Sequence, residues 1–215
     1  MLSTLIKENF NFLQSLLKRR LVKNSLYTGL ALIFIGLIPF TFNFLVGRTF
    51  GAKILGEINV TLNFCLMITI FISNFFGSAG NKFLAEFRGR ENLKNFIFVL
   101  EIIFFGSIST LIIANIILLN WWEYFSQNFS IPKEYFAPVI LYIFFRTMYV
   151  LLRRTLYGMD LVKNYTFNEI VSAFFMLGAT AYVCFFSRED FLLKTYILSY
   201  LIFFCLCIYS ILKNF

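Results

Sequence analysis

The sequence predicts an all-α membrane protein, a bundle of six transmembrane helices, and three observations lead to this fold class. Of the 215 residues, 60% are hydrophobic and only 14% are charged, which leaves too few polar side chains to cover a soluble domain. The apolar residues fall into six long stretches. Each has about 20 residues, enough for a helix to cross a hydrocarbon core of about 30 Å. The charged residues form short clusters between these stretches.

The six expected helices cover residues 26–46, 58–79, 96–119, 136–157, 165–186 and 191–212. Helix is the expected state because backbone groups in lipid must be hydrogen-bonded within the segment. Between the third and fourth helices, residues 120–135 are expected to form the longest outer loop. The chain therefore divides into a cytoplasmic segment, residues 1–24, and a six-helix transmembrane lobe, residues 25–215. In the first segment apolar residues recur at helical spacing, which predicts an amphipathic helix on the membrane surface.

The basic residues predict the orientation of the bundle. Alternate loops, together with the two ends of the chain, contain thirteen of the 19 Lys and Arg residues, and the other loops contain five. Because basic loops stay in the cytoplasm, we expect both termini to be cytoplasmic and the protein to lie in the cytoplasmic membrane. The remaining basic residue, Arg146, lies inside the fourth apolar stretch.

Several classes of function are disfavoured by what the sequence contains. The net charge of +8 is divided among loops between apolar stretches, so nucleic acid is not the expected partner. There is no His, and the four Cys show neither zinc spacing nor a disulfide framework, so no metal or cofactor is expected. The two Asp residues lie on opposite sides of the expected bundle. Acid–base chemistry would need clustered groups, so we expect no enzyme.

Three ionisable residues fall at depth within the expected helices. Arg146, Glu101 and Glu169 each lie about 9–10 Å from a basic residue at the cytoplasmic boundary. They are therefore expected in one layer, and charges at depth usually mark function. One interpretation is a polar cavity in which Arg146 binds an anionic group, since its planar fork donates several hydrogen bonds. The alternatives are a buried Arg–carboxylate pair that only holds helices together, or side chains that reach the interface.

Glycine and proline mark the expected turns and hinges. Gly51 and Gly56 would allow a tight turn between the first two helices. Gly77 and Gly80 would permit a close helix approach or a flexible helix end. Pro39 predicts a kink or hinge in the first helix.

These motifs resemble those of a known family. Residues 44–56, FLVGRTFGAKILG, are similar to the first outer turn of the Wzx-like polysaccharide flippases, in the multidrug/oligosaccharidyl-lipid/polysaccharide exporter superfamily. Residues 76–86, FGSAGNKFLAE, resemble the end of the family's second helix. Residues 154–158, RTLYG, before the fifth expected helix, show a weaker resemblance. The resemblance spans roughly residues 24–169.

The resemblance implies a transporter that moves a polyprenyl-diphosphate-linked glycan between leaflets by alternating access. Arg146, with Glu101 and Glu169 in its layer, would bind the substrate, and Arg48 would lie at the outer mouth. The family continues with a second lobe, whereas this sequence ends at Phe215. A second lobe or a second copy is therefore implied. Two other functions stay open: a truncated or split non-transporting remnant or assembly partner, and a membrane enzyme that acts on a lipid-linked substrate.

Overall fold

The computed structural model describes residues 20–214, and this part of the chain contains no β-strand. Its helices are α2 (Arg20–Gly89), α3 (Leu93–Asn128), α4 (Phe136–Gly158), α5 (Val162–Phe185) and α6 (Leu192–Asn214), with short 3₁₀ helices η1 (Lys133–Tyr135) and η2 (Glu189–Phe191). Five helical segments in this part are long and apolar enough to cross a membrane. The prediction of an all-helical chain with several possible membrane spans is therefore confirmed. The expected amphipathic helix lies in residues 1–19, outside the described residues.

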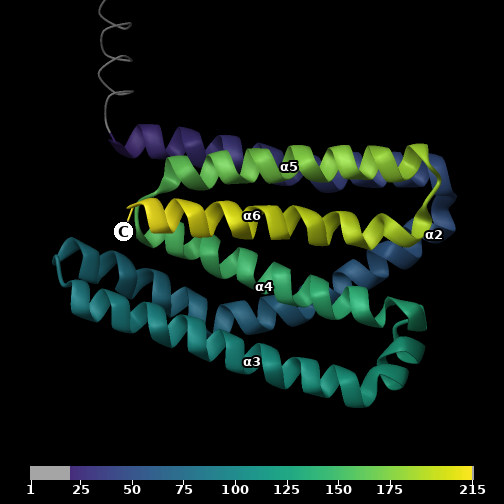
Figure 1. Cartoon of the computed structure of the whole chain (residues 1–215), viewed down its shortest axis with the longest axis horizontal. Helices are drawn as coiled ribbons and strands as arrows, with labels where there is room; N and C mark the ends of the chain where they lie inside the picture. Colours follow the sequence, from purple (N-terminus) through teal and green to yellow (C-terminus); the bar gives the residue numbers. More distant parts are fainter. Residues whose placement is uncertain (1–19, 215) are drawn as a thin grey trace, which may run out of the picture.

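Helix α2 folds back on itself at Gly51. The side chain of Asn24 donates a hydrogen bond of 2.9 Å to Asp160, while a Cβ on nearby Gly158 would lie 3.0 Å from Leu84. In a straight helix, 60 residues would separate Asn24 from Leu84 by about 90 Å. Both ends of α2 therefore reach the same end of α4, and Figure 1 shows the two halves running in opposite directions. We call residues 20–50 the first leg and residues 52–89 the second leg.

The reversal depends on a backbone conformation that glycine alone adopts readily. Gly51 has φ 83° and ψ 176°, a region that a Cβ atom makes unfavourable. It is the one residue in described α2 with non-helical φ and ψ, so Pro39 and Gly56 keep a helical backbone. The backbone of Gly77 and Gly80 also belongs to α2, but the surroundings of residues 75–81 lie outside the described part.

The observed boundaries agree with the expected ones for three helices and differ for the other three. The expected helices at residues 26–46 and 58–79 are parts of the longer legs of α2, and most of the turn expected between them is helical. Helices α4, α5 and α6 begin and end within three residues of the predicted positions. The predicted loop at residues 120–135 is wrong, because α3 continues to Asn128 through a distortion at Trp121. Tertiary contacts explain the extra turns. The indole N–H of Trp122 donates to the Lys133 carbonyl at 3.1 Å, and Ser126 Oγ donates to the Ile131 carbonyl at 2.6 Å.

The helices pack so that α6 lies between α4 and α5, with α3 at the edge of the bundle (Figure 1). Helix α2 contacts α3, α4 and α5, which places its legs on either side of the interior. Large side chains such as Phe42, Tyr142 and Phe203 are fully buried there. Many apolar side chains, including Phe105 and Phe185, instead face outward. This outer surface suits lipid, because apolar side chains are unfavourable in contact with water and are accommodated by lipid tails.

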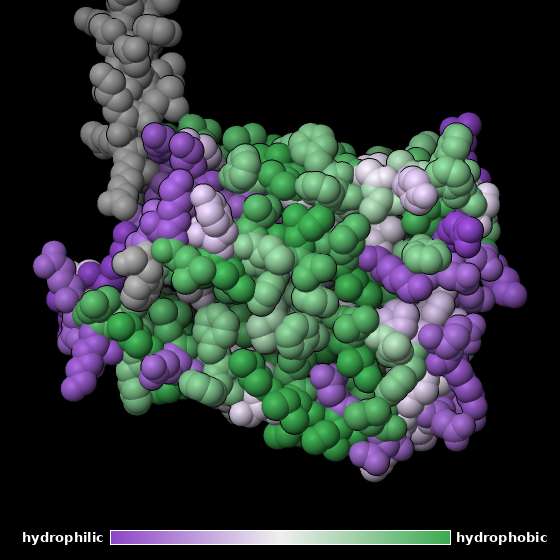
Figure 2. All heavy atoms as spheres, in the orientation of Figure 1, coloured by the Kyte–Doolittle hydropathy of each residue, from purple (hydrophilic) through white to green (hydrophobic). Residues whose placement is uncertain are grey.

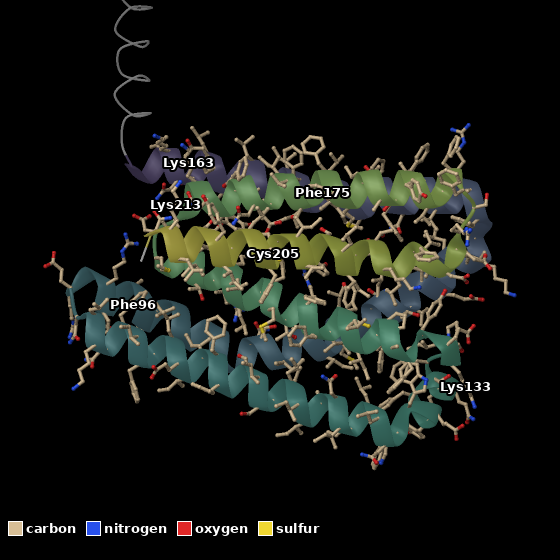
Figure 3. All side chains as sticks on the ribbon, viewed as in Figure 1. Phe96, Lys133, Lys163, Phe175, Cys205 and Lys213 are labelled. Carbon is tan, nitrogen blue, oxygen red and sulfur yellow. The ribbon has the colours of Figure 1, made fainter. Side chains whose placement is uncertain are left out.

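Charged residues gather at the two ends of the bundle. Figure 2 shows a broad hydrophobic belt with hydrophilic residues at both ends of the long axis. Figure 3 places Lys163 and Lys213 at one end and Lys133 at the other. We call these the Lys163 end and the Lys133 end. The first described residues of α2 and the last residues of α6 both lie at the Lys163 end (Figure 1).

Candidate functional site

A cavity of about 480 Å³ lies inside the hydrophobic belt, between the two legs of α2 and helices α4, α5 and α6. Its wall combines charged, amide and hydroxyl side chains with apolar ones. The polar lining residues are Asn43, Asn59, Asn63, Tyr142, Arg146, Tyr149, Glu169, Ser172, Tyr196, Ser199 and Tyr200. Polar groups are costly at this depth, so their convergence from five helical segments marks this cavity as the candidate functional site.

Helical periodicity explains how each segment presents several polar groups to the same cavity. On α4, Arg146 and Tyr149 follow Tyr142 by four and seven residues, which places all three on one face. On α6, Ser199 and Tyr200 follow Tyr196 by three and four residues, which also places them on one face. On the second leg of α2, Asn59 and Asn63 are four residues apart. Each helix therefore turns a polar stripe inward and keeps apolar residues toward lipid.

Arg146 lies against the faces of two tyrosine rings. The Cζ atom of its guanidinium is 4.7 Å from the centroid of the Tyr149 ring and 5.1 Å from that of Tyr200. One side-chain hydrogen bond, from Nη1 to the Tyr200 hydroxyl at 3.1 Å, is formed with the residues described. A guanidinium has five N–H donors, so most of the donors of Arg146 have no protein acceptor within residues 20–214.

Glu169 lies in the same cavity but forms no ion pair with Arg146 within 4.0 Å. It is 2% exposed, and the Tyr149 hydroxyl donates to its Oε1 at 2.6 Å. Tyr149 thus connects the two charges: its ring contacts the cation and its hydroxyl binds the carboxylate. The direct Arg–carboxylate pair, one of the alternatives considered from the sequence, is not the arrangement found among residues 20–214, and the guanidinium is left available toward the cavity.

A second arginine on α4 has a different environment. Arg154 donates from Nη1 to the backbone carbonyl of Ser73 at 2.5 Å. It also donates from Nη2 to the side-chain oxygen of Asn74 at 2.8 Å. Both partners belong to the second leg of α2. Arg154 therefore joins two helices through its fork and does not line the cavity.

The other residues predicted from the sequence lie in different places. Glu101 is exposed on α3 and does not line the cavity, so the structure brings together two of the three ionisable residues expected in one layer. Arg48 is exposed in the first leg, three residues before Gly51, and is also outside the cavity wall. Pro39, expected as a hinge, lines the cavity.

Sequence reasoning missed most of the cavity's polar wall. The three amides Asn43, Asn59 and Asn63 and the four tyrosines were not among the predicted site residues. The signal was present as spacing. Tyrosine and serine recur three or four residues apart on the same helical face as Arg146 or on a face of α6. A search for charged residues within the apolar stretches finds only the ionisable side chains. A search for polar residues that recur on one face of a helix would also have found the tyrosines and serines of the cavity wall.

The wall of the cavity can bind an anionic group that carries hydroxyls. Arg146 supplies a positive fork for phosphate or carboxylate oxygens, and the amides and hydroxyls can both donate and accept hydrogen bonds. No group of three or more Cys, Asp or Glu side chains within residues 20–214 is placed to share a metal ion.

Comparison with known proteins does not assign a family. No family model matches the chain, and no curated protein or solved structure gives a match.

Proposed function

We propose that this chain is a membrane transporter lobe that binds a lipid-linked oligosaccharide and takes part in its translocation for polysaccharide biosynthesis. One observation carries the proposal: a cationic fork with unused donors faces a polar cavity enclosed within an apolar belt. A fork of this kind suits the diphosphate that joins a glycan to its lipid carrier. The resemblance of residues 44–56 and 76–86 to the Wzx-like flippases points to the same substrate class.

The remainder of the cavity wall supports a saccharide next to the anionic group. Asn43, Asn59 and Asn63 provide amides that can bind sugar hydroxyls. Tyrosine rings supply flat faces together with hydroxyl groups. A cavity with apolar walls and a few converging polar groups is also the usual form of a small-molecule site.

We place the protein in the cytoplasmic membrane with both termini in the cytoplasm. Each leg of α2 is longer than the roughly 20 residues needed for a crossing, which supports six crossings in total. The Lys163 end contains the more basic of the two sets of loops, so it is assigned to the cytoplasm. Alternating access then involves a second lobe or a second copy, as the resemblance implies, with the cavity facing it.

Transport is tested with the full chain in liposomes that contain a fluorescent lipid-linked oligosaccharide. The proposal expects protein-dependent movement of the fluorescent lipid between leaflets, measured by quenching from outside. Arg146→Ala should abolish this movement, while Arg154→Lys, which retains a charged contact to α2, should preserve most of it. Glycan export in a complemented cell should follow the same order at equal membrane levels. Movement that is independent of the protein, or unchanged in Arg146→Ala, would contradict the proposal.

A further inference from the structure

A second hollowed region lies between α5 and α6, away from the cavity that contains Arg146. Two adjoining hollows of about 560 and 430 Å³ share Ala179, Tyr182 and Leu198, so they form one groove. Its lining extends along α5 from Phe174 to Phe186, the residue that follows the helix, a helical distance of about 18 Å. This length is comparable with one leaflet, half of a hydrocarbon core of about 30 Å. We call this feature the α5–α6 groove.

The part of the groove nearest the middle of the bundle is apolar and open. A Cβ atom placed on Gly178 would meet nothing within 4 Å, so the floor is not filled by a neighbouring side chain. Phe174 and Tyr182 beside it are 62% and 64% exposed. Figure 3 shows Phe175, another lining residue, midway along α5, and Figure 1 shows α5 and α6 side by side. The apolar part therefore follows the hydrophobic belt.

The opposite end of the groove is cationic. Arg188 and Lys194 line it where α5 connects to α6, at the Lys133 end of the bundle. Neither forms an ion pair within residues 20–214, although Glu189 and Asp190 follow Arg188 directly and do not line the groove. The Lys194 ammonium lies 4.1 Å from the centroid of the Phe191 ring. Two cations that form no ion pair among residues 20–214 thus lie at the Lys133 end, beside the apolar part of the groove.

We propose that the α5–α6 groove is a binding site for an anionic phospholipid. The phosphate headgroup lies between Arg188 and Lys194, and one acyl chain follows the groove past Tyr182 and Gly178. Charge complementarity identifies the headgroup, because two unpaired cations disfavour a zwitterionic lipid relative to an anionic one. The apolar part of the α5–α6 groove, about as long as one leaflet is thick, accounts for the acyl chain. This lipid site is separate from the Arg146 cavity and does not depend on the transport function.

The headgroup contact is tested on the full chain in detergent, with dioleoylphosphatidylglycerol and dioleoylphosphatidylcholine as probes. Native mass spectrometry measures lipid retained on the protein, and thermal unfolding measures stabilisation. We expect tighter binding of the phosphatidylglycerol. The double variant R188A/K194A should weaken its binding about 25-fold, at about fivefold for each cation near the headgroup. The matched variant K53A/K133A removes two charges at the same end but outside the groove, and should change binding less than twofold.

The tail contact is tested by Gly178→Phe, which fills the groove floor. Because open space surrounds Gly178, the variant should fold, and unfolding in detergent without added lipid verifies this. Binding of both phospholipids should fall, in contrast to R188A/K194A, which should reduce only the preference for the anionic one. Equal losses in R188A/K194A and K53A/K133A, or retained binding in both groove variants, would overturn the proposal. Displacement of phosphatidylglycerol by an equimolar polyprenyl phosphate would also overturn it, since that result assigns the groove to a different lipid.

Discussion

Two arginines on α4, eight residues apart, contrast in how their guanidinium groups are used. Arg154 donates to the Ser73 carbonyl and to Asn74, so its fork joins α4 to the second leg of α2. Arg146 lies on the rings of Tyr149 and Tyr200 and donates one hydrogen bond within residues 20–214. Ring faces stabilise the cation without occupying its donors. The difference separates a structural arginine from one that is available to a ligand.

The contrast has a physical origin in what surrounds each side chain. A cation held by carbonyl and amide oxygens has already exchanged water for protein acceptors, so a ligand gains little by approaching it. A cation held by ring faces keeps its outward donors, and an anion can bind them without displacing a protein partner. The comparison therefore predicts opposite consequences for stability and for binding when each arginine is removed.

The largest expected effect comes from Gly51→Val, because both arginine sites require α2 to fold back. A β-branched residue at φ 83° should destabilise the fold by about 3 kcal/mol or more. Thermal unfolding in detergent would detect this as a large fall in Tm or as loss of folded protein. The matched variant Gly56→Ala lies in helical backbone with open space around it, and should be stabilising by about 0.5–1 kcal/mol. A tolerated Gly51→Val would mean that the reversal does not require this conformation.

The next effect concerns Arg146→Ala and ligand binding. Loss of the charged donors should weaken binding of an anionic ligand by about 30- to 100-fold, which corresponds to about 2–3 kcal/mol. Farnesyl diphosphate is a suitable soluble probe, titrated by calorimetry. The thermal stability of the ligand-free protein should change little, because removing a charge from the interior of the bundle offsets the loss of one hydrogen bond and two ring contacts. A large fall in Tm with unchanged affinity would assign Arg146 a structural role.

Arg154→Ala should show the reverse pattern. Two hydrogen bonds to the second leg of α2 are removed, and we expect a loss of about 2 kcal/mol in the free energy of unfolding. Affinity for farnesyl diphosphate, corrected for the folded fraction, should stay within about threefold. If the affinity falls as much as in Arg146→Ala, the distinction between the two arginines fails.

The smallest effect separates the ring of Tyr149 from its hydroxyl. Tyr149→Phe keeps the ring beside Arg146 and removes the hydrogen bond to Glu169. The expected cost is about 1 kcal/mol in stability, with affinity nearly unchanged. Tyr209→Phe, at an exposed position on α6 outside both sites, serves as the control and should be neutral. A larger loss of affinity in Tyr149→Phe would show that Glu169 must be held by this hydroxyl for the ligand to bind.

The helices differ in how far their boundaries could be predicted from the sequence. Hydropathy and length located α4, α5 and α6 to within three residues, because the cost of burying backbone in lipid fixes helix length. The extension of α3 was not predictable in this way. Trp121 and Trp122 resemble interfacial residues in sequence, whereas the extra helical turns are stabilised by the contacts of Trp122 and Ser126 with the following turn.

The sequence gives the position of each ionisable residue along its helix, but it did not reveal the direction that each side chain faces. Arg146, Glu101 and Glu169 lie at similar distances from basic boundary residues, yet Glu101 is exposed on α3. Rotation of a helix about its own axis decides which residues face the interior, and depth contains no information about that rotation. The spacing of Tyr142, Arg146 and Tyr149 does contain it, because residues four and seven apart share a face.

The central claim is that the Arg146 cavity binds an anionic, lipid-linked group. The most direct measurement is the affinity of farnesyl diphosphate for the native chain, Arg146→Ala and Arg154→Ala under identical conditions, with thermal unfolding of each. We predict at least a tenfold loss of affinity in Arg146→Ala alone and a fall in stability in Arg154→Ala alone. Equal affinities in all three proteins, or an equal loss in both variants, would contradict the claim.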